Sequence, residues 1–131
     1  MNTKVKIEYW LSTAHYDLVS AQAMLKAKRF LYVGFLCHQV AEKCLKAYFW
    51  HICKEGPPYT HNLLLLSEKS KFDQCADEKH FALFNELMPL NIQTRYPEDK
   101  ELLLKSLNKK KCIELYGSTE EFYLWIKKLL K

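Results

Sequence analysis

Eight polar residues of the sequence could carry chemistry, and four of them follow the spacing of a single helical face. Gln39, Glu42, Lys43 and Lys46 stand at positions i, i+3, i+4 and i+7, which places their side chains in one strip along a helix. Such a strip could line a groove for a polar ligand. It could equally be the only exposed side of a buried helix, and periodicity alone favours this second interpretation. The other four candidates are Asp17, His61, Arg95 and Tyr96.

Arg95 stands out because the chain has 18 lysines and only two arginines. A guanidinium can bind phosphate or carboxylate through two parallel hydrogen bonds, which lysine cannot do. Arg95 could also pair with Glu42 or Asp17 and hold its own loop onto the helices. His61 is as readily a cap or a packed loop residue as an acid–base group. The residues alone therefore indicate a polar cleft without defining its chemistry.

Several function classes are disfavoured by what the sequence lacks. It has no Walker loop, no Rossmann glycine pattern, no nucleophile elbow and no HExxH motif. Its five cysteines form no CxxC pair and the nearby histidines lack ligand spacing, so we expect no metal and no cofactor. A polar amino-terminal segment and the lack of a long apolar run predict a cytoplasmic protein with reduced, buried thiols and no membrane contact. The net charge of +5 is interpreted as solvated lysine-bearing helix faces.

The elements that position these residues are predicted to be helices. A length of 131 residues with 49% hydrophobic side chains suits one domain, residues 1–131, and 3 glycines and 4 prolines are too few turn-formers for a many-stranded β fold. We therefore expect an all-α, up-and-down bundle of four to five helices. A stripe at positions 11, 14, 18, 21 and 25 predicts the first helix, and residues 26–29 a turn. The second helix, about residues 30–53, is apolar nearly all round and should be central.

The second half of the chain is divided by breaks at residues 55–58, at Pro89 and at Pro97. Thr60 is expected to cap a short helix that begins at His61 or Asn62. Another helix is expected over residues 77–88, followed by a loop over residues 89–97 and a helix that starts at Pro97. The last apolar stripe continues past Gly117, which we interpret as a tolerated glycine inside one long helix.

The ordered residues resemble those of the HEPN domain family. The similarity begins with Trp10, Ala14, Asp17, Leu18 and Ala21, and continues with HQVAEKCLKA at residues 38–47, YTHNL at residues 59–63 and RYP at residues 95–97. Each piece alone is common, but the QxAEKxLKA helix, the THxL turn and the RYP triplet are specific in combination. The resemblance covers nearly the whole chain, from Ile7 to about Trp125.

This resemblance implies a bundle of four or five helices, often a homodimer, with a cleft beside the central helix. Small prokaryotic members similar to this chain commonly accompany a minimal nucleotidyltransferase in a toxin–antitoxin-like pair. The resemblance further implies that Glu42, Lys43 and Lys46 line the cleft and that Arg95 closes it. Arg95 would then offer its guanidinium to a phosphate, with Tyr96 available for stacking.

One departure from the family pattern limits what the resemblance implies about catalysis. Many HEPN proteins are metal-independent ribonucleases with an arginine, four to six further residues and a histidine, and neither Arg29 nor Arg95 is followed by such a histidine. We therefore expect a module that binds nucleotide or RNA phosphate and has no catalytic activity alone. The alternatives are a metal-independent endoribonuclease that acts as a dimer, with His61 or His38 near Arg95, and a purely structural interaction partner.

Overall fold

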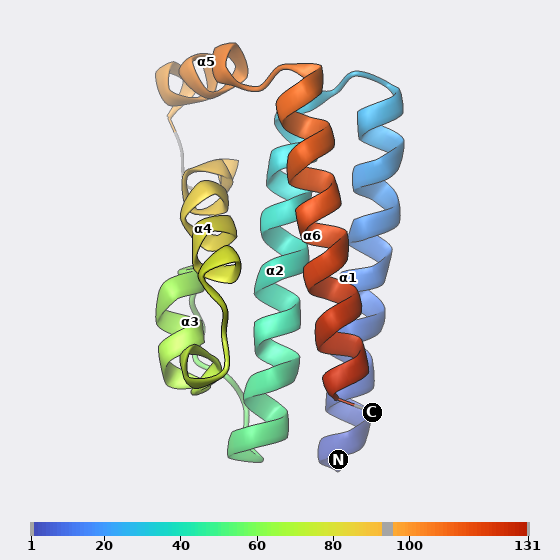
Figure 1. The fold of residues 1–131 in the computed structure, drawn as a ribbon, viewed down its shortest axis with the longest axis vertical. Coiled ribbons are helices and arrows are strands. Elements are labelled where there is room, and N and C mark those ends of the chain that lie inside the picture. Colours follow the sequence, from blue (N-terminus) through green and yellow to red (C-terminus); the bar gives the residue numbers. More distant parts are fainter. Residues whose placement is uncertain (1, 93–95, 131) are drawn as a thin grey trace.

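The chain forms an all-helical bundle in a computed structural model that describes residues 2–92 and 96–130 (Figure 1). Three long helices run side by side: α1 (Thr3–Lys26), α2 (Phe30–Cys53) and α6 (Lys109–Leu129). The shorter helices α3 (Leu63–Lys69) and α4 (Glu78–Leu87) pack against the other side of α2, and α5 (Pro97–Ser106) lies across the end of the bundle where α2 begins. Short 3₁₀ turns occupy Phe72–Gln74 and Met88–Leu90. The predicted all-α bundle is confirmed, and the short helices bring the α-helices of the described residues to six.

Asparagines and backbone turns set the ends of several helices. The side chains of Asn2, Asn62 and Asn108 accept hydrogen bonds from backbone N–H groups in the first turns of α1, α3 and α6. Pro97 opens α5, as expected, because its missing N–H is not needed in the first turn. Helix α2 ends at Cys53, and the left-handed backbone of its C-cap residue, Lys54 (φ 59°), turns the chain away from the helix axis.

The prediction of a Thr60 cap is wrong. Asn62 is the N-cap and α3 begins at Leu63, although the Thr60 hydroxyl does accept a hydrogen bond from the Asn62 N–H. Residue 61 lies before the helix because both its ring and its carbonyl are bonded to α2, as described below. The interpretation of Gly117 is confirmed, since α6 runs through it without a break.

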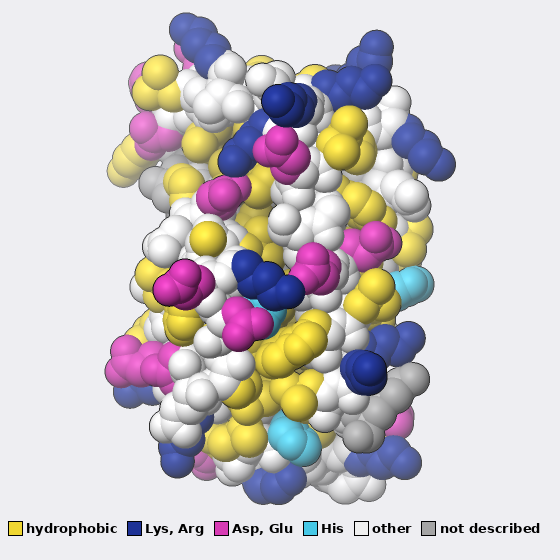
Figure 2. Space-filling model, in the orientation of Figure 1, with side chains coloured by type: hydrophobic (Ala, Val, Ile, Leu, Met, Phe, Trp, Pro, Cys, Tyr) yellow, Lys and Arg dark blue, Asp and Glu magenta, His cyan; other side chains and the backbone are white. Residues whose placement is uncertain are grey.

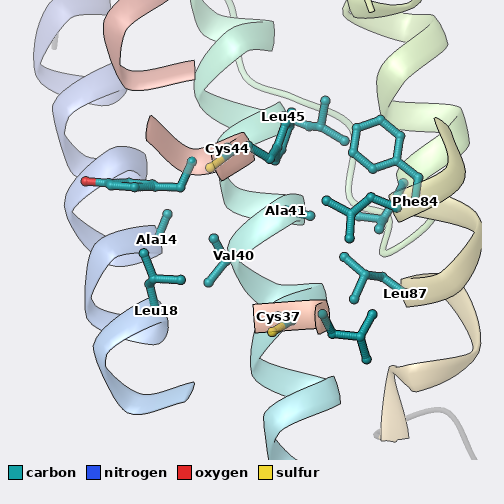
Figure 3. Packing of buried hydrophobic residues seen from close by; sticks show 14 of the residues in the cluster. Ala14, Leu18, Cys37, Val40, Ala41, Cys44, Leu45, Phe84 and Leu87 are labelled. Atoms are coloured by element: carbon teal, nitrogen blue, oxygen red, sulfur yellow. The ribbon is translucent and has the colours of Figure 1, made fainter. Parts of the chain in front are cut away.

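The core lies on both sides of α2, which is the central helix as predicted. Figure 3 shows Ala14 and Leu18 of α1 on one side of α2, near Val40, and Phe84 and Leu87 of α4 on the other, near Ala41 and Leu45. Thirteen residues of α2 are buried. Close packing of these apolar side chains fixes the rotation of α2 about its axis, and with it the directions of the polar side chains between them.

Basic side chains do not gather into one patch on the face drawn in Figure 2, where Lys and Arg side chains are interspersed with Asp and Glu. Two of the contacts between opposite charges are ion pairs between helices, Lys79 with Glu121 and Lys111 with Glu86. This mixed surface agrees with the interpretation of most lysines as solvated helix faces. Within the described residues, no helix is long and apolar enough to cross a membrane.

Candidate functional site

The polar strip of α2 is not the exposed side of the central helix, so that interpretation was wrong. Glu42 and Lys46 are buried, with 3% and 7% of their surface exposed, and Gln39 and Lys43 are half-buried. Burial arises because the segment between α2 and α3 and the first half of α1 cover this face. Two charged residues of opposite sign on adjacent turns can be buried together where each supplies the other's partner.

Glu42 is the centre of the buried network. Its Oε2 accepts a hydrogen bond from the Lys46 ammonium at 3.0 Å, and its Oε1 accepts one from Nδ1 of His61 at 2.8 Å. Both oxygens of the carboxylate are therefore occupied by charged or polar donors, as a buried carboxylate requires. His61 is one-third exposed at its side chain, so the network reaches the surface through this ring.

His38 holds the same segment by its backbone. Its Nε2–H donates to the carbonyl oxygen of His61 at 3.0 Å, while its Nδ1 accepts from the amide of Gln39 at 3.4 Å. Burial lowers the pKa of His38 from 6.5 to about 4, an effect that the nearby carboxylate of Glu42 only partly opposes. His38 is consequently neutral near pH 7, which fits its combination of one donated and one accepted hydrogen bond. His61 is thus fixed to α2 at both its ring and its carbonyl.

Asp17 and Lys43 form a separate ion pair that joins α1 to α2. Their side chains are 14% and 18% exposed, so the pair is partly shielded from water. The sequence placed Lys43 in the strip with Glu42, but adjacent positions on a helix point about 100° apart, and Lys43 turns toward α1 instead. This pair helps to align the two long helices, and it leaves neither charge without a counterion.

Tyr96 is not among the residues of this network. Arg95 lies outside the described residues. Tyr96 is exposed and precedes α5, which lies at the end of the bundle where α2 begins (Figure 1). Of the eight candidates, the structure therefore unites Gln39, Glu42, Lys46 and His61 and places the Asp17–Lys43 pair beside them.

A groove beside the network contains residues that the sequence analysis did not select. It has a volume of about 280 Å³ and is bounded by α1, α2 and the segment after α2. Four aromatic rings, two prolines and two lysines line it: Lys6, Tyr9, Trp10, Lys46, Trp50, Pro57, Pro58 and Tyr59. We call it the aromatic groove. A sequence signal existed, because Lys6 and Trp10, and likewise Lys46 and Trp50, are spaced i, i+4 on their helices.

The lysines of the aromatic groove lie over its indole rings. The Lys46 ammonium is 5.2 Å from the ring centroid of Trp10, and the Lys6 ammonium is 5.9 Å from that of Trp50. Such contacts hold each cation at an aromatic face. The Tyr59 ring meets His61 edge to face at 5.7 Å, which links the groove to the Glu42 network.

Two further findings concern the molecule outside this site. A larger hollow of about 830 Å³ lies between α1 and α6, and its walls are mainly apolar and lysine side chains outside the network. Within the described residues, no group of three or more His, Cys, Asp or Glu side chains is placed to hold a metal ion. The expectation of uniformly buried thiols was wrong in part, because Cys75 is exposed and Cys53 half-buried, whereas Cys37, Cys44 and Cys112 are buried.

The fold and this site define a class of protein: an all-helical bundle whose central helix carries a buried Glu–Lys–His network beside an aromatic groove. The family model of the HEPN domain matches residues 7–129. The chain belongs to the HEPN domain family, as its sequence motifs indicated.

A solved structure supports the same fold. The crystal structure of TT1696 from Thermus thermophilus is similar with a TM-score of 0.79, and the match covers 98% of this chain and 98% of that chain. The two sequences are 21% identical, so the similarity concerns the fold alone. A comparison with curated proteins gives no significant match.

Proposed function

We propose that this HEPN domain binds a nucleotide, or an unpaired stretch of RNA, in the aromatic groove. The observation that carries the proposal is the combination of four aromatic rings and two lysines in one groove. Bases stack on aromatic side chains with about 1–3 kcal/mol each, and lysines attract the phosphates that connect them. The volume of about 280 Å³ suits a base or a mononucleotide, since pockets for larger ligands run from about 300 to 1,000 Å³.

The charge balance of the groove favours an anionic ligand. No carboxylate side chain is among the described residues that line it, and its two cations are Lys6 and Lys46. Glu42 offsets the charge of Lys46 through their ion pair, so Lys6 is the groove's principal phosphate contact in this proposal. This assignment differs from the expectation for the α2 strip, whose lysines both have carboxylate partners.

The Glu42 network acts in this proposal as a positioning device. By fixing the ring and the carbonyl of His61, Glu42 and His38 hold the segment that contains Pro57, Pro58 and Tyr59 against α2. Tyr59 is 92% exposed, and it is the groove's most accessible ring for a base. Because Glu42 and His38 act through the wall, their substitution would weaken binding without removing a ligand contact.

Binding can be measured through the tryptophans, because Trp10 and Trp50 line the groove whereas the partly buried Trp125 lies elsewhere, against Phe72 and His80. A Trp125→Phe background isolates the groove signal. Titration with AMP, UMP and a short unpaired RNA should quench the fluorescence of Trp10 and Trp50. Lys6→Gln should weaken binding and reduce its salt dependence, since one phosphate contact is lost.

Lys110→Gln is the matched control, because it removes the same charge from an exposed position at the start of α6. If neither the mononucleotides nor the RNA quench the groove tryptophans, the proposal is wrong. It is also wrong if Lys6→Gln and Lys110→Gln reduce the affinity equally, because the attraction would then be a property of the net charge.

The partner is proposed on the family resemblance alone. We propose that the protein pairs with a minimal nucleotidyltransferase in a toxin–antitoxin-like module. The test is co-expression of the chain with such an enzyme and purification through a tag on one of the two. A stable stoichiometric complex supports the pairing, and complete separation at moderate salt contradicts it.

A second candidate function, metal-independent RNA cleavage, is favoured by the His61–Glu42 contact. A carboxylate that holds Nδ1–H of an accessible imidazole leaves Nε2 to take a proton from a 2′-hydroxyl. Labelled RNA incubated in EDTA with the wild type, Arg95→Ala and His61→Gln separates the two functions. Cleavage that is lost in both variants supports a ribonuclease, and intact RNA in every lane rules out this candidate.

A further inference from the structure

The hollow between α1 and α6 is separate from the aromatic groove, because no residue lines both. It extends along α1 from Thr3 to His15, which at about 1.5 Å per residue is a length of about 18 Å. Its volume of about 830 Å³ falls within the range of about 300–1,000 Å³ that is typical of small-molecule sites. The hollow is therefore large enough for a ligand of its own.

The floor of this hollow is apolar. Ile7 and Leu11 of α1 line it on one side, and Tyr123 and Leu130 of α6 line it on the other. His15 and Tyr123 are the last lining residues in the direction away from the chain termini, and their rings lie 5.8 Å apart between centroids. This ring contact joins the two helices and bounds the hollow at that end. A linear apolar chain laid along the floor would be removed from water on the side that faces the bundle.

Three lysines from three different helices line the other end of the hollow. Lys4 stands in the first turn of α1, Lys54 follows the end of α2, and Lys127 stands in the last turn of α6. These three helix ends lie at the same end of the bundle in Figure 1. Among the described residues none of the three lysines has an ion-pair partner, and Glu8 is the one carboxylate in the lining. The charge at this end therefore favours an anion.

We propose that the hollow binds a single-chain amphiphile with an anionic head, of which a medium-chain fatty carboxylate is the simplest example. The head lies among Lys4, Lys54 and Lys127, and the chain runs along the floor toward Tyr123. The polarity of the hollow carries the inference, because cations gather at one end and apolar side chains continue toward the other. A helix of another protein would contact the same floor, but it would give no reason for the cations to gather at one end.

The ligand class is tested by calorimetric titration with octanoate, decanoate and dodecanoate, all far below the concentrations at which they form micelles. Each added methylene should raise the affinity about two- to fourfold, and fourfold corresponds to complete burial of a CH₂ group at about 0.8 kcal/mol. Dodecyltrimethylammonium has the same chain as dodecanoate but a cationic head. It should bind at least about tenfold more weakly, since like charges placed together oppose binding.

The position of the head is tested by removing the lysines of the hollow. A triple variant in which Lys4, Lys54 and Lys127 are replaced by glutamine should weaken dodecanoate binding about tenfold, because three partly exposed charge contacts are lost. The matched control removes the same charge from three exposed lysines at the opposite end of the bundle, and it should leave the affinity unchanged: Lys105→Gln, Lys109→Gln and Lys110→Gln.

The position of the chain is tested by obstructing the hollow at Ser12, an exposed lining residue whose hydroxyl donates to the carbonyl oxygen of Tyr9. Side chains on a helix lean toward its amino end, so the ring in Ser12→Phe would extend along the hollow and should weaken dodecanoate binding at least about tenfold. Ser106→Phe is the matched control, because Ser106 is likewise exposed and donates to the carbonyl oxygen three residues earlier, that of Leu103. Circular dichroism checks that each variant is folded.

Four results would overturn the inference: no saturable binding of dodecanoate, equally tight binding of dodecyltrimethylammonium, an equal loss in the two triple lysine variants, or an equal affinity of Ser12→Phe and Ser106→Phe. Binding of a synthetic acidic amphipathic peptide in place of dodecanoate would also overturn it, since the hollow would then be a groove for a helix. The test is independent of the proposed nucleotide site, because none of the substituted residues lines the aromatic groove.

Discussion

Replacing Glu42 with alanine tests whether the buried network stabilises the fold. The substitution removes a carboxylate whose side chain is 4% exposed and leaves the Lys46 ammonium, in a side chain 8% exposed, without its counterion. Removing one partner of a buried ion pair costs about 3–5 kcal/mol, out of a total stability of about 5–15 kcal/mol for a domain. With an m-value of about 2 kcal/mol per molar urea, the unfolding midpoint should fall by about 2 M.

The matched control is Glu121→Ala, which breaks the pair with Lys79 at 2.5 Å on the surface. Both side chains of that pair are more than half exposed, so water replaces the lost partner and the midpoint should not move measurably. The double variant Glu42→Leu with Lys46→Met should recover most of the loss, because neither buried charge then remains unpaired. The reasoning is refuted if Glu42→Ala shifts the urea midpoint no further than Glu121→Ala does.

Three further predictions concern the glycines, His38 and the cysteines. Gly117→Ala should stabilise the protein by about 0.5–1 kcal/mol in urea unfolding, because alanine favours a helix over glycine and its methyl group meets nothing within 4 Å. Gly34→Ala should stabilise it less, since the methyl group there would lie 3.0 Å from Leu90. The pKa of His38 is 6.5 in the unfolded chain and about 4 in the folded protein, so acid favours the unfolded chain. The free energy of unfolding should therefore fall by about 2 kcal/mol from pH 7 to pH 5, and His38→Gln should flatten this dependence. An equally steep profile in His38→Gln would contradict the conclusion that His38 is responsible. A thiol reagent at pH 8 should modify Cys75 and then Cys53 in the folded protein, and it should reach the three buried cysteines only in urea. Burial also makes those thiols unreactive, because it raises the pKa of Cys37 to about 12 and that of Cys112 to about 11. Rapid modification of five thiols without urea would contradict their burial.

The helices were largely predictable because their signals are local. The apolar periodicity of residues 30–53 reproduces α2, whose bounds are Phe30–Cys53, and Pro97 marks the start of α5. The expected helix over residues 77–88 differs from α4 by one residue at each end. The prediction failed at Thr60 because two long-range hydrogen bonds join His61 to α2, one donated by its ring to Glu42 and one accepted by its carbonyl from His38, and no local pattern encodes them.

The site was predicted only in part, because its burial depends on contacts between distant segments. Sequence spacing identified Glu42 and Lys46 as neighbours, and the structure confirms the contact. Sequence spacing could not show that the segment after α2 covers these two residues. This cover buries a strip that was expected to be exposed. The aromatic groove was missed for the same reason, since Trp10 and Tyr59 are brought together across 49 positions of sequence only by the fold.

If the aromatic groove binds the proposed ligand, the segment between α2 and α3 also determines what that binding costs in conformational entropy. Pro57 and Pro58 restrict its backbone, and the double attachment of His61 fixes its far end before any ligand arrives. A wall that is already ordered loses little further freedom on binding, so more of the stacking and phosphate free energy remains as affinity. Association should then proceed in a single kinetic phase, because no slow folding of the wall has to precede contact with the ligand.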